Sequence, residues 1–151
     1  MRWNPFAAAI VLLVACPAPK PAGPWGGESI VWRTYAEGLK VAAQEHRPLC
    51  VVFVTTWCPH CKAYANVFGD PRVIEQAKHF VMVRVDDDKE PEVAARLAPD
   101  GRYIPRTFFL SAQGELDPTL VARPDRFRYF YEENNPDSLL SGMTRATARL
   151  Q

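Results

Sequence analysis

Five consecutive residues of this chain combine side chains suited to redox chemistry: Trp57, Cys58, Pro59, His60 and Cys61. Two cysteines three positions apart lie on one face of the first turn of a helix, close enough for their sulfur atoms to form a disulfide. Backbone N–H groups at a helix N-terminus lack intrahelical partners, and with the helix dipole they stabilise a thiolate. Pro59 suits the first helical position, a protonated His60 adds a cation beside the sulfur, and Trp57 shields the site. The motif predicts thiol–disulfide exchange, with Cys58 as nucleophile and Cys61 as the resolving thiol.

Two other interpretations of the cysteine pair are a zinc site and a purely structural disulfide. Zinc needs two further ligands of similar spacing, whereas the remaining cysteines and histidines, Cys16, Cys50, His46 and His79, are isolated in the sequence. A disulfide that closes so short a loop constrains the unfolded chain little. We therefore expect redox exchange that uses no metal and no cofactor beyond the cysteine pair itself.

The composition is that of one globular domain. The chain has 151 residues, 48% of them hydrophobic and 23% charged, which is enough apolar content for a proper core. Its net charge of +1 gives no argument for nucleic acid as a partner.

The first 16 residues predict an export signal. Arg2 supplies a minimal charged region, and residues 6–15 form an apolar stretch too short to span a bilayer as a helix. The stretch ends in Leu13-Val14-Ala15-Cys16, which resembles the lipobox of bacterial lipoproteins. That resemblance implies cleavage before Cys16 and lipidation of this cysteine. An ordinary secretory signal or an uncleaved apolar arm is the alternative.

Residues 17–27 predict a linker, since four prolines favour an extended, semi-rigid tether. We expect this tether to hold a domain of residues 28–151 away from a membrane surface. Trp25 is unusual for a linker, and the sequence leaves open whether it packs against the domain.

Within the domain, helices and strands are expected to alternate. Periodicity and turn residues predict helices at 29–45, 59–68, 73–78 and 91–97 and from Asn135 to the C-terminus, and strands at 49–54, 80–85, 107–110 and 115–121. Residues 49–54 show no polar alternation, which is typical of a strand in a sheet covered on both faces. Cys50 is expected to be a small core residue of that strand. Phe127, Tyr129 and Tyr131 alternate with Arg126, Arg128 and Phe130, and we expect this aromatic segment to cover the core rather than to form a substrate surface.

This order of elements, with the Cys-x-x-Cys motif before a helix and Ile104-Pro105 before a strand, resembles the thioredoxin superfamily. The resemblance implies an α/β thioredoxin-like fold, with a central mixed sheet of about four to five strands flanked by helices. It further implies that Ile104–Pro105 is a cis peptide bond facing the two sulfur atoms. The backbone of Ile104 would then pair with a bound substrate segment as an added strand.

Several shorter stretches resemble the anterior-gradient branch of the protein disulfide isomerase family over about residues 25–150. These stretches are Trp32-Arg33-Thr34, Gly38-Leu39-Lys40, Ala42-Ala43, Pro48-Leu49, Phe80-Val81-Met82-Val83, Pro99-Asp100-Gly101, Tyr103-Ile104-Pro105-Arg106 and Tyr129-Phe130-Tyr131. The chain ends Arg149-Leu150-Gln151, without a KDEL-like signal, and begins with a lipoprotein-like leader. We therefore expect a bacterial relative of this branch and not a resident of the endoplasmic reticulum.

Two details bear on the chemistry. The dipeptide between the cysteines, Pro59-His60, is the one found in oxidising DsbA-type proteins, whose potential is about −120 mV against about −270 mV for thioredoxin. Thioredoxins carry a buried acid in the strand before the active site, and Val52 takes that place here. Proton transfer at Cys61 must then use water, His60 or another group.

The sequence predicts a thiol–disulfide oxidoreductase, a disulfide donor or isomerase, acting on exported proteins with thiols or disulfides. We expect it to be lipid-anchored through Cys16 to a bacterial membrane, facing the periplasm or the cell exterior, and recycled by a membrane or soluble redox partner. One alternative is a reductase that supplies electrons to exported thiols. Others are a non-catalytic, redox-sensing protein that binds clients and, more weakly, a metal-handling protein.

Overall fold

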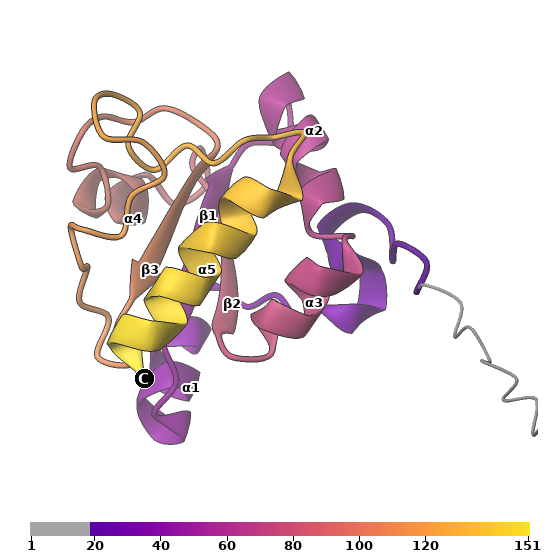
Figure 1. The fold of residues 1–151 in the computed structure, drawn as a ribbon. Coiled ribbons are helices and arrows are strands. Elements are labelled where there is room, and N and C mark those ends of the chain that lie inside the picture. The colour runs from indigo at the N-terminus through magenta and orange to yellow at the C-terminus, as the bar shows by residue number, and fades with distance from the viewer. Residues whose placement is uncertain (1–18) are drawn as a thin grey trace, which may run out of the picture.

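The computed structural model describes residues 19–151, which form helices packed around a central sheet (Figure 1). Its elements are a 3₁₀ helix η1 (Pro24–Ser29), α1 (Tyr35–Glu45), β1 (Leu49–Val54), α2 (Pro59–Val67), α3 (Pro71–Ala77), β2 (Val81–Asp86), α4 (Pro91–Arg96), β3 (Arg106–Leu110) and α5 (Pro136–Leu150). The predicted leader, 1–16, and its lipobox residue Cys16 lie outside the described residues. Between residues 19 and 151, no helix combines the length and the apolar character that crossing a membrane requires.

The sheet has three strands in the order β2–β1–β3, with β1 parallel to β2 and antiparallel to β3. This mixed sheet is smaller than the four to five strands that we predicted. Two isolated bridges lie where outer strands would pair with the sheet: Arg33 with Val83, and Leu110 with Leu116. The second bridge does not grow into the predicted strand 115–121, because Pro118 has no N–H to donate and the chain turns there.

Both faces of the sheet are covered, as the apolar run of β1 predicted. Side chains of one parity pack against α2, α3 and α5, and those of the other parity pack against α1 and α4. Helix α5, yellow in Figure 1, crosses in front of the strands. Five of the six residues of β1 are buried, among them the free thiol of Cys50. This strand is the centre of the core and ends four residues before Cys58.

Helix α1 begins at Tyr35, six residues later than predicted. Thr34 forms a capping box with Glu37, each side chain bonding the other residue's backbone N–H. This local signal outweighs the apolar spacing that placed the start at residue 29. Gly38 stands inside the helix because a Cβ there would collide with Val83 of β2.

The end of the predicted linker packs on the domain. Trp25 lies in η1, its ring 5.6 Å from that of Trp32 and 5.3 Å from that of Phe68. The indole N–H of Trp32 donates to the carbonyl of Trp25 at 2.8 Å, and Arg84 lies over both tryptophan rings. The aromatic contacts settle the question that the sequence left open for Trp25.

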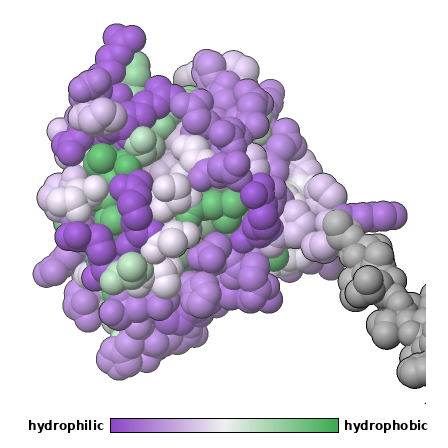
Figure 2. Space-filling view, viewed as in Figure 1, coloured by the Kyte–Doolittle hydropathy of each residue, from purple (hydrophilic) through white to green (hydrophobic). Residues whose placement is uncertain are grey.

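Residues 126–131 divide between core and surface. Tyr129 and Tyr131 are buried, whereas Phe127 is 42% exposed, with a left-handed φ of 51°. The face seen in Figure 2 is mostly hydrophilic, with apolar residues in small separate areas. The largest exposed apolar side chains of residues 19–151 are single residues, Val31, Trp57 and Phe127.

Candidate active site

The two cysteines of the motif lie at the N-terminus of α2 and form a disulfide. Cys58 is the N-cap residue, Pro59 is the first helical residue, and the Cα atoms of Cys58 and Cys61 are 5.3 Å apart. The backbone N–H of Cys61 donates to Cys58 Sγ at 3.1 Å. After reduction, the same N–H and the helix dipole stabilise a negative charge on this sulfur. Each cysteine is only 2% exposed, so its reactivity depends on how closely a substrate thiol can approach its sulfur atom.

The Ile104–Pro105 peptide bond is cis, as the resemblance implied. Pro105 is buried, and β3 begins directly after it at Arg106, which pairs with Phe53 of β1. Because β1 and β3 are antiparallel, the start of β3 and the end of β1 meet at the same edge of the sheet. Cys58 follows β1 at that edge, so the fold places the loop that contains Ile104 and Pro105 at the same end of the molecule as the disulfide.

Trp57 is 64% exposed, and its indole N–H donates to Asp88 Oδ2 at 2.7 Å. The sequence indicated Trp57 as a shield for the sulfur atoms but did not identify its partner. Asp88 belongs to the acidic turn of residues 86–90, at the end of β2. The structure uses Asp88 from that turn to orient the indole.

His60 does not stand alone as the cation that we predicted beside the sulfur. Its Nδ1 donates to Glu133 Oε2 at 2.7 Å, and its ring lies 6.4 Å from that of Phe130. The imidazole side chain is 62% exposed and the Glu133 carboxylate 21% exposed. Glu133 partly compensates any positive charge on His60, which weakens the effect of His60 on the thiolate. No sequence pattern connects these residues, because 73 positions separate them.

A cleft of 450 Å³ reaches Cys61 from the side of β2. Its walls include Thr55, Asp86 and Glu90, and it is wide enough to hold water. The Thr55 hydroxyl is buried without a hydrogen-bond partner among residues 19–151. Val52, which stands where thioredoxins resemble one another in carrying a buried acid, is completely buried. Cys61 therefore has no acid at the position of Val52, and the cleft that it lines, with Asp86 and Glu90 in its walls, is its connection to solvent.

One further contact holds the helix with the cysteines to the strand after the cis peptide. The hydroxyls of Tyr64 in α2 and Thr107 in β3 lie 2.9 Å apart, and both residues are completely buried. Tyr64 is buried because its position on α2 faces the sheet. Burial raises the pKa of the Tyr64 hydroxyl, so it stays protonated and available for this bond.

Comparison with known proteins agrees with this geometry. The thioredoxin-like family matches residues 31–112, which is more than half of the chain. The chain belongs to the thioredoxin-like family. This thioredoxin-like chain is 32% identical over 143 residues to anterior gradient protein 3 of Xenopus tropicalis, covering 89% of the chain and 82% of the relative. It is 31% identical over 134 residues to the human anterior gradient protein 2 homolog, covering 84% and 71%. The resemblance to anterior gradient proteins is confirmed as a distant homology over most of the chain.

Solved structures confirm the α/β thioredoxin-like fold. A thioredoxin from Thermus thermophilus superposes with a TM-score of 0.60 at 23% identity, covering 78% of this chain and 86% of that chain. A protein described as DsbH oxidoreductase has a TM-score of 0.56 at 20% identity, covering 87% and 92%. At these identities the likeness concerns the fold alone.

Proposed function

We propose that this thioredoxin-like protein is a thiol–disulfide oxidoreductase that acts on exported polypeptides through Cys58 and Cys61. The observation that carries the proposal is the position of the Cys58 sulfur. It caps α2, is bonded to Cys61 and accepts the N–H of Cys61 at 3.1 Å. This arrangement favours a stabilised thiolate at Cys58 with a second thiol one turn away.

As a disulfide donor, the protein begins in the disulfide form. A substrate thiolate attacks Cys58 Sγ, the Cys58–Cys61 bond breaks, and Cys61 leaves as a thiolate that takes up a proton. A second substrate thiolate attacks the substrate sulfur of the mixed disulfide, which forms the substrate disulfide and releases the Cys58 thiolate. Two electrons thus pass from the substrate to the cysteine pair, and a membrane or soluble redox partner removes them. No resident cofactor is required, because the two sulfur atoms hold the electrons.

Proton exchange at Cys61 runs through the cleft of 450 Å³. Water in this cleft gives the proton to the departing Cys61 thiolate, and in the reverse direction it accepts the proton from the Cys61 thiol. A buried acid fixed beside Cys61 would exchange this proton faster than water does, because no proton carrier would have to diffuse to the site. We therefore expect slow turnover at Cys61.

The direction of electron flow depends on the redox potential. The Pro59-His60 dipeptide favours an oxidising site, which supports a donor or isomerase, whereas the contact of His60 with Glu133 opposes this effect. If Glu133 dominates, the same chemistry runs as a reductase that supplies electrons to exported thiols.

The location and partners are part of the proposal. The lipobox-like end of the leader supports export and lipidation at Cys16, and the proline-rich residues after it support a tether. The substrates would then be exported proteins at the surface of a bacterial membrane. Cys16→Ala in the full chain is expected to remove the lipid mass and release the protein from the membrane fraction. Retention of the Cys16→Ala protein on the membrane would contradict the tether.

The redox equilibrium with glutathione, followed by thiol labelling, tests the function. A potential well above that of thioredoxin, nearer about −150 mV than about −270 mV, supports the donor or isomerase. A value near or below about −250 mV supports the reductase. Cys58→Ser is expected to abolish insulin reduction and dithiol oxidation, whereas the control Cys50→Ala keeps both. Unchanged activity of Cys58→Ser would refute the mechanism.

Replacing both cysteines separates an enzyme from a protein that only binds clients. A Cys58→Ala/Cys61→Ala variant that keeps client binding and the wild-type phenotype would establish the binding protein. Loss of the phenotype in that variant, with normal folding, would support the enzyme.

A further inference from the structure

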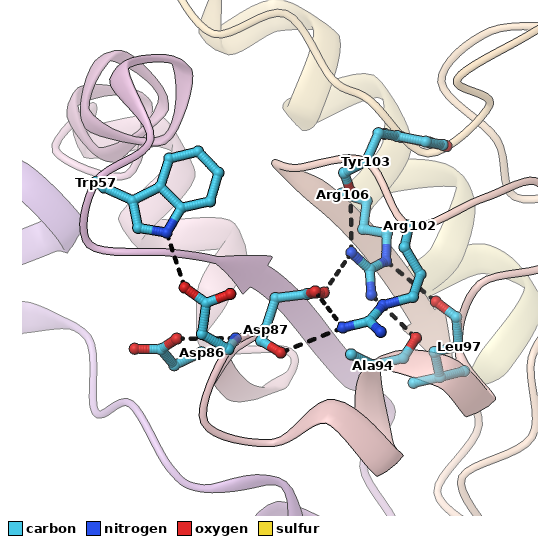
Figure 3. A network of polar contacts seen from close by, with 9 residues as sticks. Trp57, Asp86, Asp87, Ala94, Leu97, Arg102, Tyr103 and Arg106 are labelled. Carbon is cyan, nitrogen blue, oxygen red and sulfur yellow. Dashed lines mark hydrogen bonds and ion pairs between the residues drawn. The ribbon is translucent and has the colours of Figure 1, made fainter.

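The acidic turn after β2 contacts the site on two sides (Figure 3). Asp88 accepts the indole N–H of Trp57, directly before the disulfide, at 2.7 Å. Its neighbour Asp87 points the other way and forms ion pairs with Arg106 and Arg102, both at 2.7 Å. Arg106 follows the cis proline. Two consecutive carboxylates therefore tie the cysteine segment and the cis-proline loop to one turn.

Arg106 is completely buried, which is rare for an arginine. Its guanidinium lies 4.2 Å from the centre of the Phe53 ring, and it donates to the carbonyls of Ala94, Leu97 and Tyr103 at 3.1, 3.1 and 2.9 Å. The Asp87 carboxylate compensates its charge. The three carbonyls that it holds lie in α4, directly after α4 and in the cis-proline loop.

The bond to Tyr103 matters most for substrate binding. The Tyr103 carbonyl and the Ile104 N–H belong to one peptide unit, which is planar, with the two groups on opposite sides. Arg106 Nη1, by holding the carbonyl, sets the direction of the N–H. A charged donor on the carbonyl also polarises the peptide and strengthens the N–H as a donor.

We propose that Arg106, held by Asp87, is a positioning residue that aims the Ile104 N–H at the backbone of a bound polypeptide. This inference rests on the proposed function, in which Ile104 pairs with a substrate segment. Small thiols do not use this N–H, because they have no extended backbone to pair with it. Arg106 therefore acts on polypeptide affinity and leaves the chemistry at Cys58 and Cys61 unchanged.

The test compares two substrates of the full chain in detergent. The KM and kcat for reduction of insulin report polypeptide binding, and the rate of exchange with dithiothreitol reports the cysteine pair alone. Arg106→Lys keeps the charge but has a single ammonium that cannot hold three carbonyls and a carboxylate. We expect the KM for insulin to rise about 10-fold, with kcat and the dithiothreitol rate near those of the wild type.

Two more variants keep the test decisive. Asp87→Asn removes the charge that holds Arg106 and is expected to raise the same KM, by about 3-fold. This variant carries the test if Arg106→Lys does not fold. Met143→Ala is the control for a general loss of stability. Met143 is completely buried in α5, so this substitution is expected to lower the stability without changing the KM for insulin.

The outcomes separate the inference from the function on which it rests. A wild-type KM in folded Arg106→Lys or Asp87→Asn protein would overturn the inference, as would an equal rise in KM in Met143→Ala. An equal loss of the dithiothreitol rate and of insulin reduction in Arg106→Lys would also overturn it, because the effect would then lie at the cysteines. A wild-type protein that exchanges with neither substrate would refute the proposed function itself.

Discussion

The bond between Tyr64 and Thr107 gives a quantitative test of how the site is held together. It joins the helix that carries the cysteines to the strand that follows the cis peptide, with 2.9 Å between two completely buried hydroxyls. Tyr64→Phe leaves the Thr107 hydroxyl buried without this partner, which costs about 1–3 kcal/mol of unfolding free energy. Thr107→Val leaves the Tyr64 hydroxyl in the same situation, and we expect a similar loss.

The double variant distinguishes this bond from general packing. Tyr64→Phe/Thr107→Val removes both polar atoms and nearly preserves the shape of the site, so it leaves no unpaired hydroxyl. Its loss is expected to be smaller than the sum of the single losses by about 1–3 kcal/mol. Urea unfolding at pH 7, with the slope of each transition compared, measures all four proteins.

A matched control is available in the same core. The Tyr131 hydroxyl is buried and has no hydrogen-bond partner among residues 19–151. Tyr131→Phe removes an unpaired polar atom and is expected to be neutral or stabilising, in contrast to Tyr64→Phe. Additive losses in the double variant, or an equal loss in Tyr131→Phe, would refute the reasoning.

Three further predictions concern thiols and pH. Cys61→Ser is expected to accumulate mixed disulfides between Cys58 and substrate, detected as dithiothreitol-sensitive bands on a non-reducing gel; none would appear if Cys61 did not resolve them. Burial raises the pKa of Cys50, so this thiol should label with iodoacetamide only on unfolding, and rapid labelling of the native protein would contradict its burial. Hydrogen bonds from Thr119, aided by Arg149, lower the pKa of Asp117 from 3.8 to about 2. The stability from this depressed pKa is present above pH 3.8 and is lost as the pH falls toward about 2. Asp117→Asn should therefore be less stable than the wild type at pH 6 and equally stable near pH 2, and a constant difference in urea unfolding would rule out this effect.

The secondary structure was predictable where the signal is local. The apolar run of β1, the proline starts of α2 and α4 and the Asn135 cap of α5 all belong to short stretches of sequence. Prediction failed where apolar spacing was given more weight than a capping or turn residue. The start of α1 was placed too early because the capping box of Thr34 and Glu37 sets it, and the last predicted strand shrank to one bridge because the chain turns at Pro118.

In the candidate site, local spacing and family resemblance each identified part of the residues. Cys58, Pro59 and Cys61 could be found from the sequence because their chemistry depends on spacing within one helical turn. The cis peptide at Pro105 came from family resemblance, since no local rule requires it.

The sequence by itself thus determined a cysteine pair at a helix start, an apolar central strand and a fold class. Only the tertiary structure decided the partners of these residues: Glu133 for His60, Asp88 for Trp57 and Asp87 for Arg106. Each of these contacts joins segments that are distant in the chain, and such contacts produce no regular spacing of residues that a sequence pattern could reveal. They depend on how the strands pair and how the loops meet at one edge of the sheet, which packing of the whole chain decides.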